Sequence, residues 1–232
     1  MFRGSKVLSI IPARKNSKSL PNKNTLELNG KPLIHWTINS SLNNDFIDDT
    51  LITTDSDLIL NYAKIFDVLL RGRPEKFAGD NISMTHVLNN LFEREPNLVK
   101  KYDFFVLLQP TSPLRTEKHI SKAFLELEKN EASDSLISGV QVDNSSLKNL
   151  IQQKNGFLEE IDSYGFFSFN RQSLPKLFKP NGAIYIMKIK EFLSSGKLIS
   201  KNTIPFKMQI EESLDIDSIE DFNQIKNVFK SS

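Results

Sequence analysis

The chain has 232 residues, of which 39% are apolar, so it is long enough for one medium-sized domain with a hydrophobic core. Its 30 basic and 28 acidic residues nearly cancel, and without an extended basic face this composition excludes a typical nucleic-acid-binding protein. The lack of cysteine excludes disulfides, thiolate metal ligands and cysteine nucleophiles. Because no signal-peptide pattern opens the chain and no apolar run approaches a membrane span, we expect a cytoplasmic protein without a membrane partner.

Short apolar segments alternate with amphipathic ones along the chain, which is typical of an α/β domain with a largely parallel sheet. Strands are predicted over residues 6–11, 50–54, 68–70, 104–109, 135–142, 183–187 and 203–210. Helices are predicted over residues 32–42, 58–65, 84–95, 118–130, 188–194 and 218–229. We therefore expect residues 1–232 to form a single domain built around one sheet.

A basic loop follows the first predicted strand. Residues 11–24 carry four Lys or Arg side chains among Ser and Asn, and residues 1–31 hold seven basic residues against a single acid. Cations, hydroxyls and backbone N–H groups at the carboxyl edge of a parallel sheet are what a polyphosphate requires. The alternative is a solvated basic turn without a ligand.

The predicted strand over residues 104–109 is apolar on both faces, as a central parallel strand should be. It ends at Gln109, at the sheet edge where ligands bind in open α/β folds. A glutamine there can hydrogen-bond a sugar hydroxyl or carboxylate. Alternatively, it satisfies the backbone of the turn that Pro110, Pro113 and Arg115 make rigid.

Residues 143–180 differ in character from the rest of the chain. They are polar at first and then rich in Phe and Tyr, and they separate two predicted core strands. Exposed aromatic side chains favour contact with a partner. We therefore expect an inserted lobe here rather than a linker.

Six acids and no base fall within residues 211–221. If residues 214–217 are extended, the carboxylates of Asp215 and Asp217 point to one face and Ile216 points to the core. Two carboxylates on one face suit Mg²⁺, which bridges substrate phosphates. The alternative is that Asp217 caps the last helix and forms a capping box with Glu220, and the two roles are compatible.

Four segments, in order along the chain, resemble the CMP-sugar synthetases, the acylneuraminate cytidylyltransferases. They are residues 11–24, 107–115 (LLQPTSPLR), 181–186 (NGAIYI) and 214–222 (LDIDSIEDF). The resemblance implies a three-layer, Rossmann-like nucleotide-diphospho-sugar transferase fold with a dimerisation insertion at about residues 143–180, and hence a homodimer. It also implies an enzyme that transfers CMP from CTP to a nine-carbon, sialic-acid-like 2-keto sugar acid, with Mg²⁺ or Mn²⁺ held by Asp215 and Asp217.

The resemblance also assigns roles to individual residues. It implies that Arg14 and Lys23 contact the triphosphate, with Lys23 stabilising the charge that develops on the α-phosphate. Further nucleotide-binding residues would be Ala13, Ser17, Asn24, Arg73 and Ser83. The sugar pocket would be lined by Gln109, Asn181 and Tyr185, and the sugar carboxylate would meet Arg171 and Lys148.

The basic loop departs from the commonest form of the family signature, because Lys15 and Asn16 stand where two glycines are usual. Glycine permits positive φ and a close backbone approach to phosphate, so the loop contacts stay open. A catalytically weak nucleotide-binding module is therefore an alternative, as is a structural protein that assembles through the aromatic insertion.

Within the enzyme class, residues 181–186 and 171–175 favour neuraminate or legionaminate over pseudaminate or octulosonate. The product of such a reaction would feed a bacterial surface polysaccharide or a flagellin glycan.

Overall fold

The computed structural model describes residues 2–79, 81–161 and 164–231. Its main strands are β1 (Val7–Pro12), β4 (Asp49–Thr54), β5 (Leu69–Gly72), β6 (Phe104–Leu107), β7 (Ser135–Val142), β10 (Leu177–Lys188) and β11 (Thr203–Lys207). Its α-helices are α1 (Leu33–Leu42), α2 (Asp57–Ala63), α3 (Met84–Arg94), α4 (Pro96–Lys101), α5 (Glu117–Glu128), α6 (Ile189–Ser195) and α7 (Ile219–Ser231). Short additional elements are β2 (Glu27–Leu28), β3 (Lys31–Pro32), η1 (Lys23–Thr25) and η2 (Glu75–Phe77).

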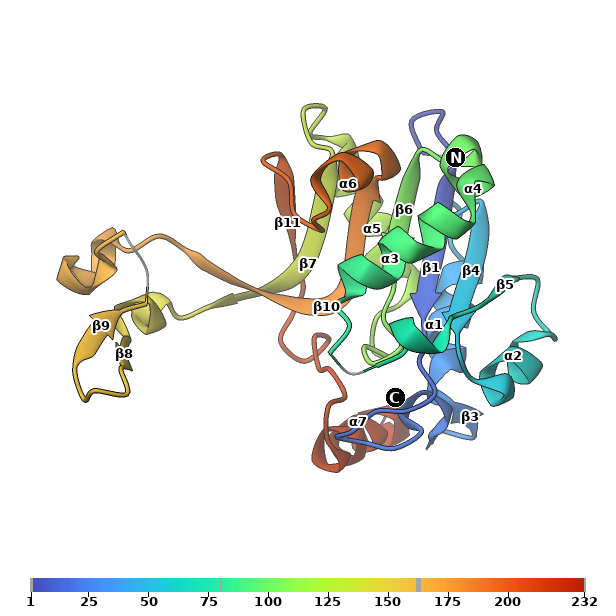
Figure 1. Cartoon of the computed structure of the whole chain (residues 1–232), viewed down its shortest axis with the longest axis horizontal. Coiled ribbons are helices and arrows are strands. Elements are labelled where there is room, and N and C mark those ends of the chain that lie inside the picture. The colour runs from blue at the N-terminus through green and yellow to red at the C-terminus, as the bar shows by residue number, and fades with distance from the viewer. Residues whose placement is uncertain (1, 80, 162–163, 232) are drawn as a thin grey trace.

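The seven main strands form one sheet in the order β11-β7-β10-β6-β1-β4-β5, with helices on both faces (Figure 1). β10 runs antiparallel to both of its neighbours, and the other neighbouring strands are parallel. The predicted α/β class and mostly parallel sheet are confirmed. Within the described residues, no helix combines the length and the apolar character that crossing a membrane requires.

The core has three parts. On one face of the sheet Val7 and Ile11 of β1 pack with α1, α2 and α5, and on the other face Leu8 and Ile10 pack with α3, α4 and α6. This alternation follows from the period of two along a strand, with every residue of β1 buried. In a third cluster, α7 and the fully buried Ile216, which precedes it, pack against the segment that follows β1. That cluster brings the acidic end of the chain against the basic loop.

Two elements differ most from the prediction. β10 begins at Leu177 rather than at residue 183. The prediction missed its first half because that half contains Pro and Gly, which are unusual in strands. Its pairing with β7 shifts register between Pro180 and Tyr185. Helix α4 was not predicted; Pro96 occupies its first turn, where a missing N–H costs nothing, and so starts a new helix rather than only ending the previous one.

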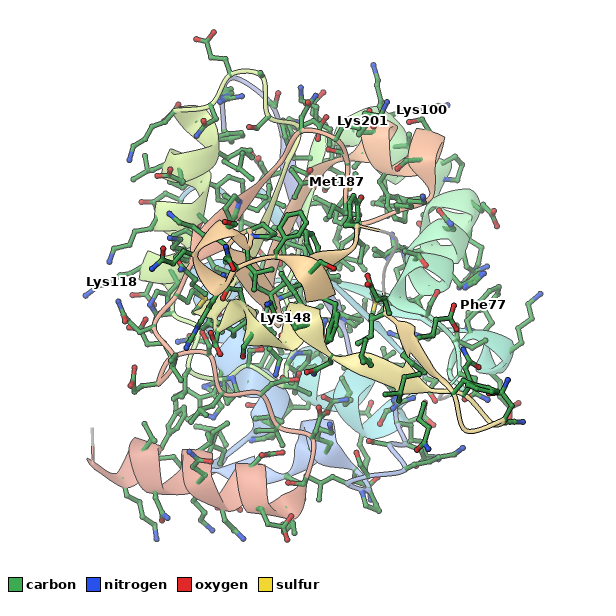
Figure 2. The ribbon with its side chains drawn as sticks, turned by 90° about the vertical axis from the view of Figure 1, so that its left-hand side faces the viewer. Phe77, Lys100, Lys118, Lys148, Met187 and Lys201 are labelled. Carbon is green, nitrogen blue, oxygen red and sulfur yellow. The ribbon has the colours of Figure 1, made fainter. Side chains whose placement is uncertain are left out.

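A lobe projects from the sheet between β7 and β10 (Figure 1). It contains the short elements η3 (Asn144–Lys148), β8 (Leu150–Gln152), β9 (Leu158–Glu160), η4 (Phe166–Ser168) and η5 (Arg171–Ser173). Seen from the side of the lobe, Lys148 lies in front of the sheet (Figure 2). The side chains of Phe157 and Tyr164 are 73% and 74% exposed. This lobe lies within the insertion predicted over residues 143–180, and pairing between two copies stays a prediction.

β10 approaches β7 closely at Gly139. A Cβ placed there would lie 2.3 Å from the carbonyl oxygen of Lys179 and 2.8 Å from the ring of Phe178. We expect Gly139→Ala to push the two strands apart and to lower the free energy of unfolding by about 1–3 kcal/mol. Denaturant titration measures this, with Gly72→Ala as a matched control, since a Cβ at Gly72 would meet nothing within 4 Å. Equal stability of the two variants would contradict the close approach.

Candidate active site

A pocket of ≈ 250 Å³ lies at the carboxyl ends of β1 and β6, the sheet edge at which open α/β folds bind ligands. Its polar lining consists of Arg14, Ser17, Lys23, Asn24, Arg73, Gln109, Thr111, Asp215 and Asp217. Its apolar side is formed by Phe77, Ile82, Met84 and Val87, together with prolines. We call it the first pocket. The basic loop and the acidic segment, distant in sequence, therefore face each other here.

The basic loop is fixed by three contacts to its surroundings. The Ala13 N–H donates to the carbonyl of Thr53 (3.0 Å), the Lys15 N–H donates to Oδ1 of Asp55 (2.7 Å), and Nδ2 of Asn24 donates to the Arg14 carbonyl (2.9 Å). Positive φ occurs at Asn22 and not at Lys15 or Asn16. The loop therefore needs no glycine at those two positions, because a carboxylate from the end of β4 holds its backbone instead.

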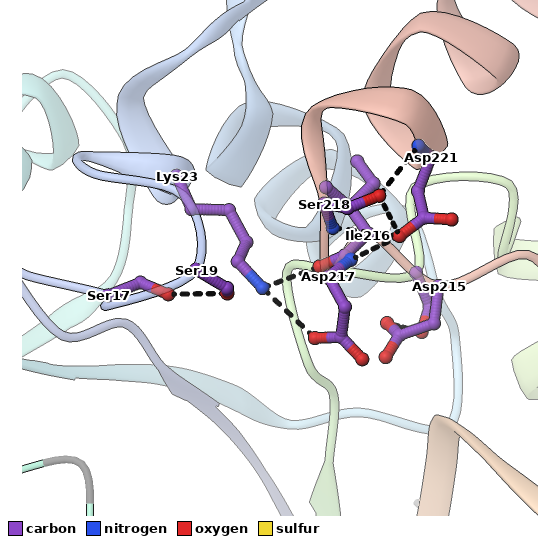
Figure 3. A network of polar contacts seen from close by, with 9 residues as sticks. Ser17, Ser19, Lys23, Asp215, Ile216, Asp217, Ser218 and Asp221 are labelled. Carbon is purple, nitrogen blue, oxygen red and sulfur yellow. Dashed lines mark hydrogen bonds and ion pairs between the residues drawn. The ribbon is translucent and has the colours of Figure 1, made fainter.

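Lys23 links the two charged segments directly. Its ammonium donates to the Ile216 carbonyl (2.5 Å) and to Oδ1 of Asp217 (3.1 Å), as Figure 3 shows. Only 7% of Lys23 is exposed. A buried ammonium at the border of the pocket is a strong local charge, since little water screens it.

Arg73 is a second buried cation in the first pocket, with 9% of its surface exposed. Its Nη2 donates to the Thr53 carbonyl (2.9 Å), but its Nε has no hydrogen-bond partner among the described residues. Burial lowers the pKa of Arg73 to about 10, with Arg14 acting in the same direction and Asp55 opposing. The side chain stays charged at neutral pH, and a cation that lines the pocket suits a phosphate ligand.

The two predicted metal-binding carboxylates lie side by side, on the same side of their segment (Figure 3). Burial raises the pKa of Asp215, and the nearby Asp217 carboxylate raises it further. Thr111, Lys23 and Ser112 oppose this shift, and the Ser112 hydroxyl donates to Oδ1 of Asp215 (3.4 Å). The side chain of Asp217 is 79% exposed. The predicted alternation holds, because Ile216 between them is fully buried.

The cap of α7 differs from the alternative that the sequence suggested. The Asp221 N–H donates to Oγ of Ser218 (3.2 Å), and the Ser218 N–H donates to Oδ2 of Asp221 (2.8 Å). This reciprocal pair is a capping box shifted by one residue from Asp217 and Glu220. Asp217 is therefore not the cap, and its carboxylate pairs with Lys23 (Figure 3) and lines the first pocket.

A second pocket, of ≈ 640 Å³, adjoins the first. It shares Gln109, Asp215 and Asp217 with the first pocket. Its other lining residues are Val140, Lys179, Pro180, Asn181, Gly182, Tyr185, Ile210, Ser213, Leu214 and Asp221. Three of the residues predicted to bind the sugar, Gln109, Asn181 and Tyr185, thus lie in one pocket beside the two carboxylates.

Gln109 and Asn181 differ in what they offer to a ligand. The amide of Gln109 lies against Gly182, at φ +76°, and forms no hydrogen bond with the described residues. The amide of Asn181 is fully used inside the protein. Its Oδ1 accepts from Ser138 (2.6 Å) and from the Ala183 N–H, and its Nδ2 donates to Oγ of Ser213 (2.9 Å). Asn181 therefore braces the pocket wall against the segment that leads to Asp215.

Four predicted site residues lie outside the linings of both pockets. Ala13 is fully buried behind the loop, and Ser83 caps α3 by accepting from the His86 N–H. Lys148 and Arg171 lie in the lobe, where Arg171 pairs with Asp143 at 3.3 Å. Within one chain, the structure does not bring these residues to the pockets.

Two residues that shape the site were not predicted as site residues. Asp55 follows β4 directly, so its position at the end of a predicted strand could have indicated a site residue. Arg115 is 2% exposed and donates to the carbonyls of Gln109 and Ala183 (3.0 Å each) and to Oγ1 of Thr37 (2.6 Å). Burial lowers its pKa to about 9. Its bond to the Gln109 carbonyl fits the predicted rigid turn, whereas no local pattern could reveal its long-range acceptors on Ala183 and Thr37.

Comparison with known proteins assigns this chain to a family. The profile of the family described as Cytidylyltransferase matches residues 8–231. The chain is 31% identical to an N-acylneuraminate cytidylyltransferase of Escherichia coli O18:K1:H7, over 94% of this chain and 51% of that protein. It is 32% identical to a CMP-N,N'-diacetyllegionaminic acid synthase of Legionella pneumophila, over 92% of this chain and 91% of that protein. The chain thus spans about half the length of the N-acylneuraminate relatives.

Solved structures agree on the fold. A CMP:2-keto-3-deoxy-manno-octonic acid synthetase complexed with CTP matches with a TM-score of 0.70 at 15% identity, over 98% of this chain and 99% of that chain. This likeness confirms the cytidylyltransferase fold that the sequence resemblance implied. From the profile match and the relatives we conclude that the chain belongs to the cytidylyltransferase family.

Proposed function

We propose that this protein transfers CMP from CTP to a sialic-acid-like, nine-carbon 2-keto sugar acid and releases pyrophosphate. One observation carries the proposal: two pockets meet at Gln109, Asp215 and Asp217. The first pocket is lined by three cations and suits a triphosphate. The second is larger and lined by amide, hydroxyl and carboxylate groups, and it suits a polyhydroxylated second substrate. The shared residues lie where the two substrates would react.

In the proposed reaction the anomeric hydroxyl of the sugar attacks the α-phosphorus of CTP. The bond from that phosphorus to the bridging oxygen breaks, pyrophosphate leaves with the electron pair, and the hydroxyl proton passes to solvent. Phosphoryl-type transfer needs little covalent help, so the protein acts by positioning and by charge neutralisation. Arg14, Lys23 and Arg73 would pair with phosphate oxygens, and Lys23 would exchange Asp217 for the α-phosphate.

Asp215 and Asp217 are the residues that would hold Mg²⁺ or Mn²⁺. In the described parts of the chain no third His, Cys, Asp or Glu joins them in a metal-binding group. Two carboxylates fit a hard cation that keeps water and phosphate oxygens as its remaining ligands. Such an ion would neutralise the phosphates and help to activate the attacking hydroxyl.

The sugar class is proposed from the relatives. Proteins named for neuraminate and legionaminate activation are 31% and 32% identical to this chain, whereas a pseudaminic acid cytidylyltransferase of Campylobacter jejuni is 26% identical. We therefore favour a neuraminate or legionaminate type of sugar, with pseudaminate or octulosonate as the alternative. The enzyme would act in the cytoplasm.

We also propose that the lobe pairs two copies of the chain. Its exposed side chains include Phe157, Leu158, Tyr164 and Phe167, each more than half exposed. Apolar patches of this kind mark interaction surfaces. Sedimentation equilibrium should give a dimer, and replacing Phe157 and Tyr164 by serine should shift it towards the monomer. A wild-type monomer at all concentrations would contradict the pairing.

The reaction is tested by measuring pyrophosphate release from CTP and Mg²⁺ with neuraminate, legionaminate, pseudaminate and octulosonate in turn. We expect release with one of the first two sugars and none without sugar. Binding of CTP without release in the presence of any sugar would contradict the proposal and would favour a nucleotide-binding module. ATP, GTP and UTP serve as controls for the base.

A further inference from the structure

The segment that leads to the two carboxylates has no regular secondary structure. Between the end of β11 and the start of α7, residues 208–218 form neither helix nor strand, and residues 209–211 are exposed. Asp215 and Asp217, which line both pockets, therefore depend on individual contacts of this segment for their position. In such a segment, a few contacts to rigid elements fix the geometry of the site.

Glu212 closes a turn in this segment and connects it to α5. Its Oε2 accepts from the Gln209 N–H (3.4 Å), and its Oε1 lies 3.3 Å from Nε2 of His119. The next residue, Ser213, donates to the Gln209 carbonyl (2.7 Å) and accepts from Nδ2 of Asn181 (2.9 Å). The turn is therefore held from two sides, by α5 and by the wall of the second pocket.

His119 is oriented by the capping box of α5. The Thr116 N–H donates to Nδ1 of His119 (3.2 Å), and the His119 N–H donates to Oγ1 of Thr116 (3.4 Å). Because Nδ1 accepts a backbone N–H, we assign the proton of the neutral imidazole to Nε2, the nitrogen nearest to Glu212. The side chains of His119 and Glu212 are 12% and 42% exposed, so water screens their contact only in part.

The start of α5 is a rigid support for this contact. Arg115, directly before the helix, donates to the carbonyls of Gln109 and Ala183, and Nδ2 of Asn44 donates to the Glu117 carbonyl (2.9 Å). The turn between β6 and α5 also receives the far end of the acidic segment, because the Ile216 N–H donates to the Thr111 carbonyl (2.9 Å). The same support therefore holds the segment before and after Asp215.

The contact between His119 and Glu212 borders a cavity. Both side chains line this cavity, which has a volume of ≈ 490 Å³ and is also lined by Trp36 of α1 and Phe229 of α7. On the cavity side, close packing does not restrict the two side chains. The polar contact, more than packing, thus determines where the segment lies.

We propose that His119 is a positioning residue for the transfer of CMP, because through Glu212 it holds residues 209–217 so that Asp215 and Asp217 lie at the junction of the two pockets. This rests on the proposed function. His119 lines neither of the two pockets, so it acts on the rate through the position of these carboxylates. A displacement of about 1 Å, caused far from the chemistry, can cost about 10²-fold in rate.

Two variants of His119 keep the capping box and differ at the contact with Glu212. Glutamine and glutamate both offer an oxygen to the Thr116 N–H, but only glutamine can also donate to Glu212. We expect His119→Gln to keep kcat within about threefold of the wild type, and His119→Glu to lower kcat about tenfold or more, with a smaller change of KM for CTP. Lys118→Gln is the matched control, because it alters the charge of the same turn by one unit at an exposed side chain.

The double variant His119→Glu/Glu212→Gln exchanges donor and acceptor across the same contact. The amide at position 212 can donate to the carboxylate at position 119 and still accept from the Gln209 N–H, so we expect most of kcat to return. Hydrogen exchange of the backbone amides of residues 209–217, followed by mass spectrometry, measures the same effect without turnover. Exchange should be faster in His119→Glu than in the wild type and slow again in the double variant.

An unchanged kcat in His119→Glu, or the same loss in Lys118→Gln, would overturn the proposal. It would also be overturned if His119→Gln lost as much rate as His119→Glu, or if the double variant recovered neither kcat nor slow exchange. The proposed function fails separately, by the absence of pyrophosphate release in the wild type. In that case the exchange measurement alone decides whether His119 holds the segment.

Discussion

Asp215→Asn is expected to lower kcat by about 10²–10³-fold while leaving the protein at least as stable as the wild type. The loss of rate follows from removing one of the two carboxylates at the junction of the pockets, where charge must be held during transfer. Asparagine keeps the shape and the ability to accept from Ser112. Steady-state kinetics at saturating CTP and sugar measures the effect.

The expected stability of Asp215→Asn follows from the raised pKa of Asp215. A carboxyl whose pKa is higher in the folded than in the unfolded protein binds its proton more tightly when folded. Its contribution to stability is therefore full below the unfolded pKa and is lost as pH rises through the folded pKa. At pH 7 the wild type bears the cost of the buried charge, which the amide avoids. A Tm of Asp215→Asn below that of the wild type at pH 7 would contradict this, and unchanged kcat would remove Asp215 from the site.

Lys23→Met is expected to reduce kcat by about 10²–10³-fold, with a smaller rise of KM for CTP. Lys23 is buried at the border of the pocket, so its charge is little screened and acts most strongly on the phosphorus that is attacked. The variant also leaves the Ile216 carbonyl and Asp217 without their partner. Single-turnover measurement with bound CTP separates the chemical step from nucleotide binding.

The matched control for Lys23 is Lys15→Met. Lys15 lies in the same loop but is exposed and does not line the pocket, and methionine keeps the N–H that donates to Asp55. We expect near wild-type kinetics for this control. If both variants lost the same rate, the effect would come from the net charge of the loop and not from Lys23 in the pocket.

Much of the fold could be predicted because it is encoded locally. The apolar runs at β1 and β6 are buried on both faces, and period-two alternation places Ile216 in the core between Asp215 and Asp217. The basic loop and the acidic segment stand out by charge alone. Their contact, through Lys23, required the fold to bring the two ends together.

The parts that could not be predicted depend on distant contacts. Asn181 was expected to face the sugar, but acceptors and donors from three segments occupy its amide. Arg115 was predicted only as part of the turn after Gln109, and its contacts with Ala183 and Thr37 depend on segments distant in sequence. The capping box of α7 was predicted one residue too early, because Ser218 and Asp221 fit the capping-box spacing as well as Asp217 and Glu220 do. Lys179 lines the second pocket only because β10 extends beyond its apolar half.

The most direct test of the central claim is a transfer experiment with a sugar acid carrying ¹⁸O in its anomeric hydroxyl. The wild type, supplied with CTP and Mg²⁺, should yield a CMP-sugar whose mass includes the label, together with one equivalent of unlabelled pyrophosphate. This outcome requires that the anomeric oxygen attacks the α-phosphorus and stays in the product. Formation of CMP or CDP without a labelled CMP-sugar would contradict the account.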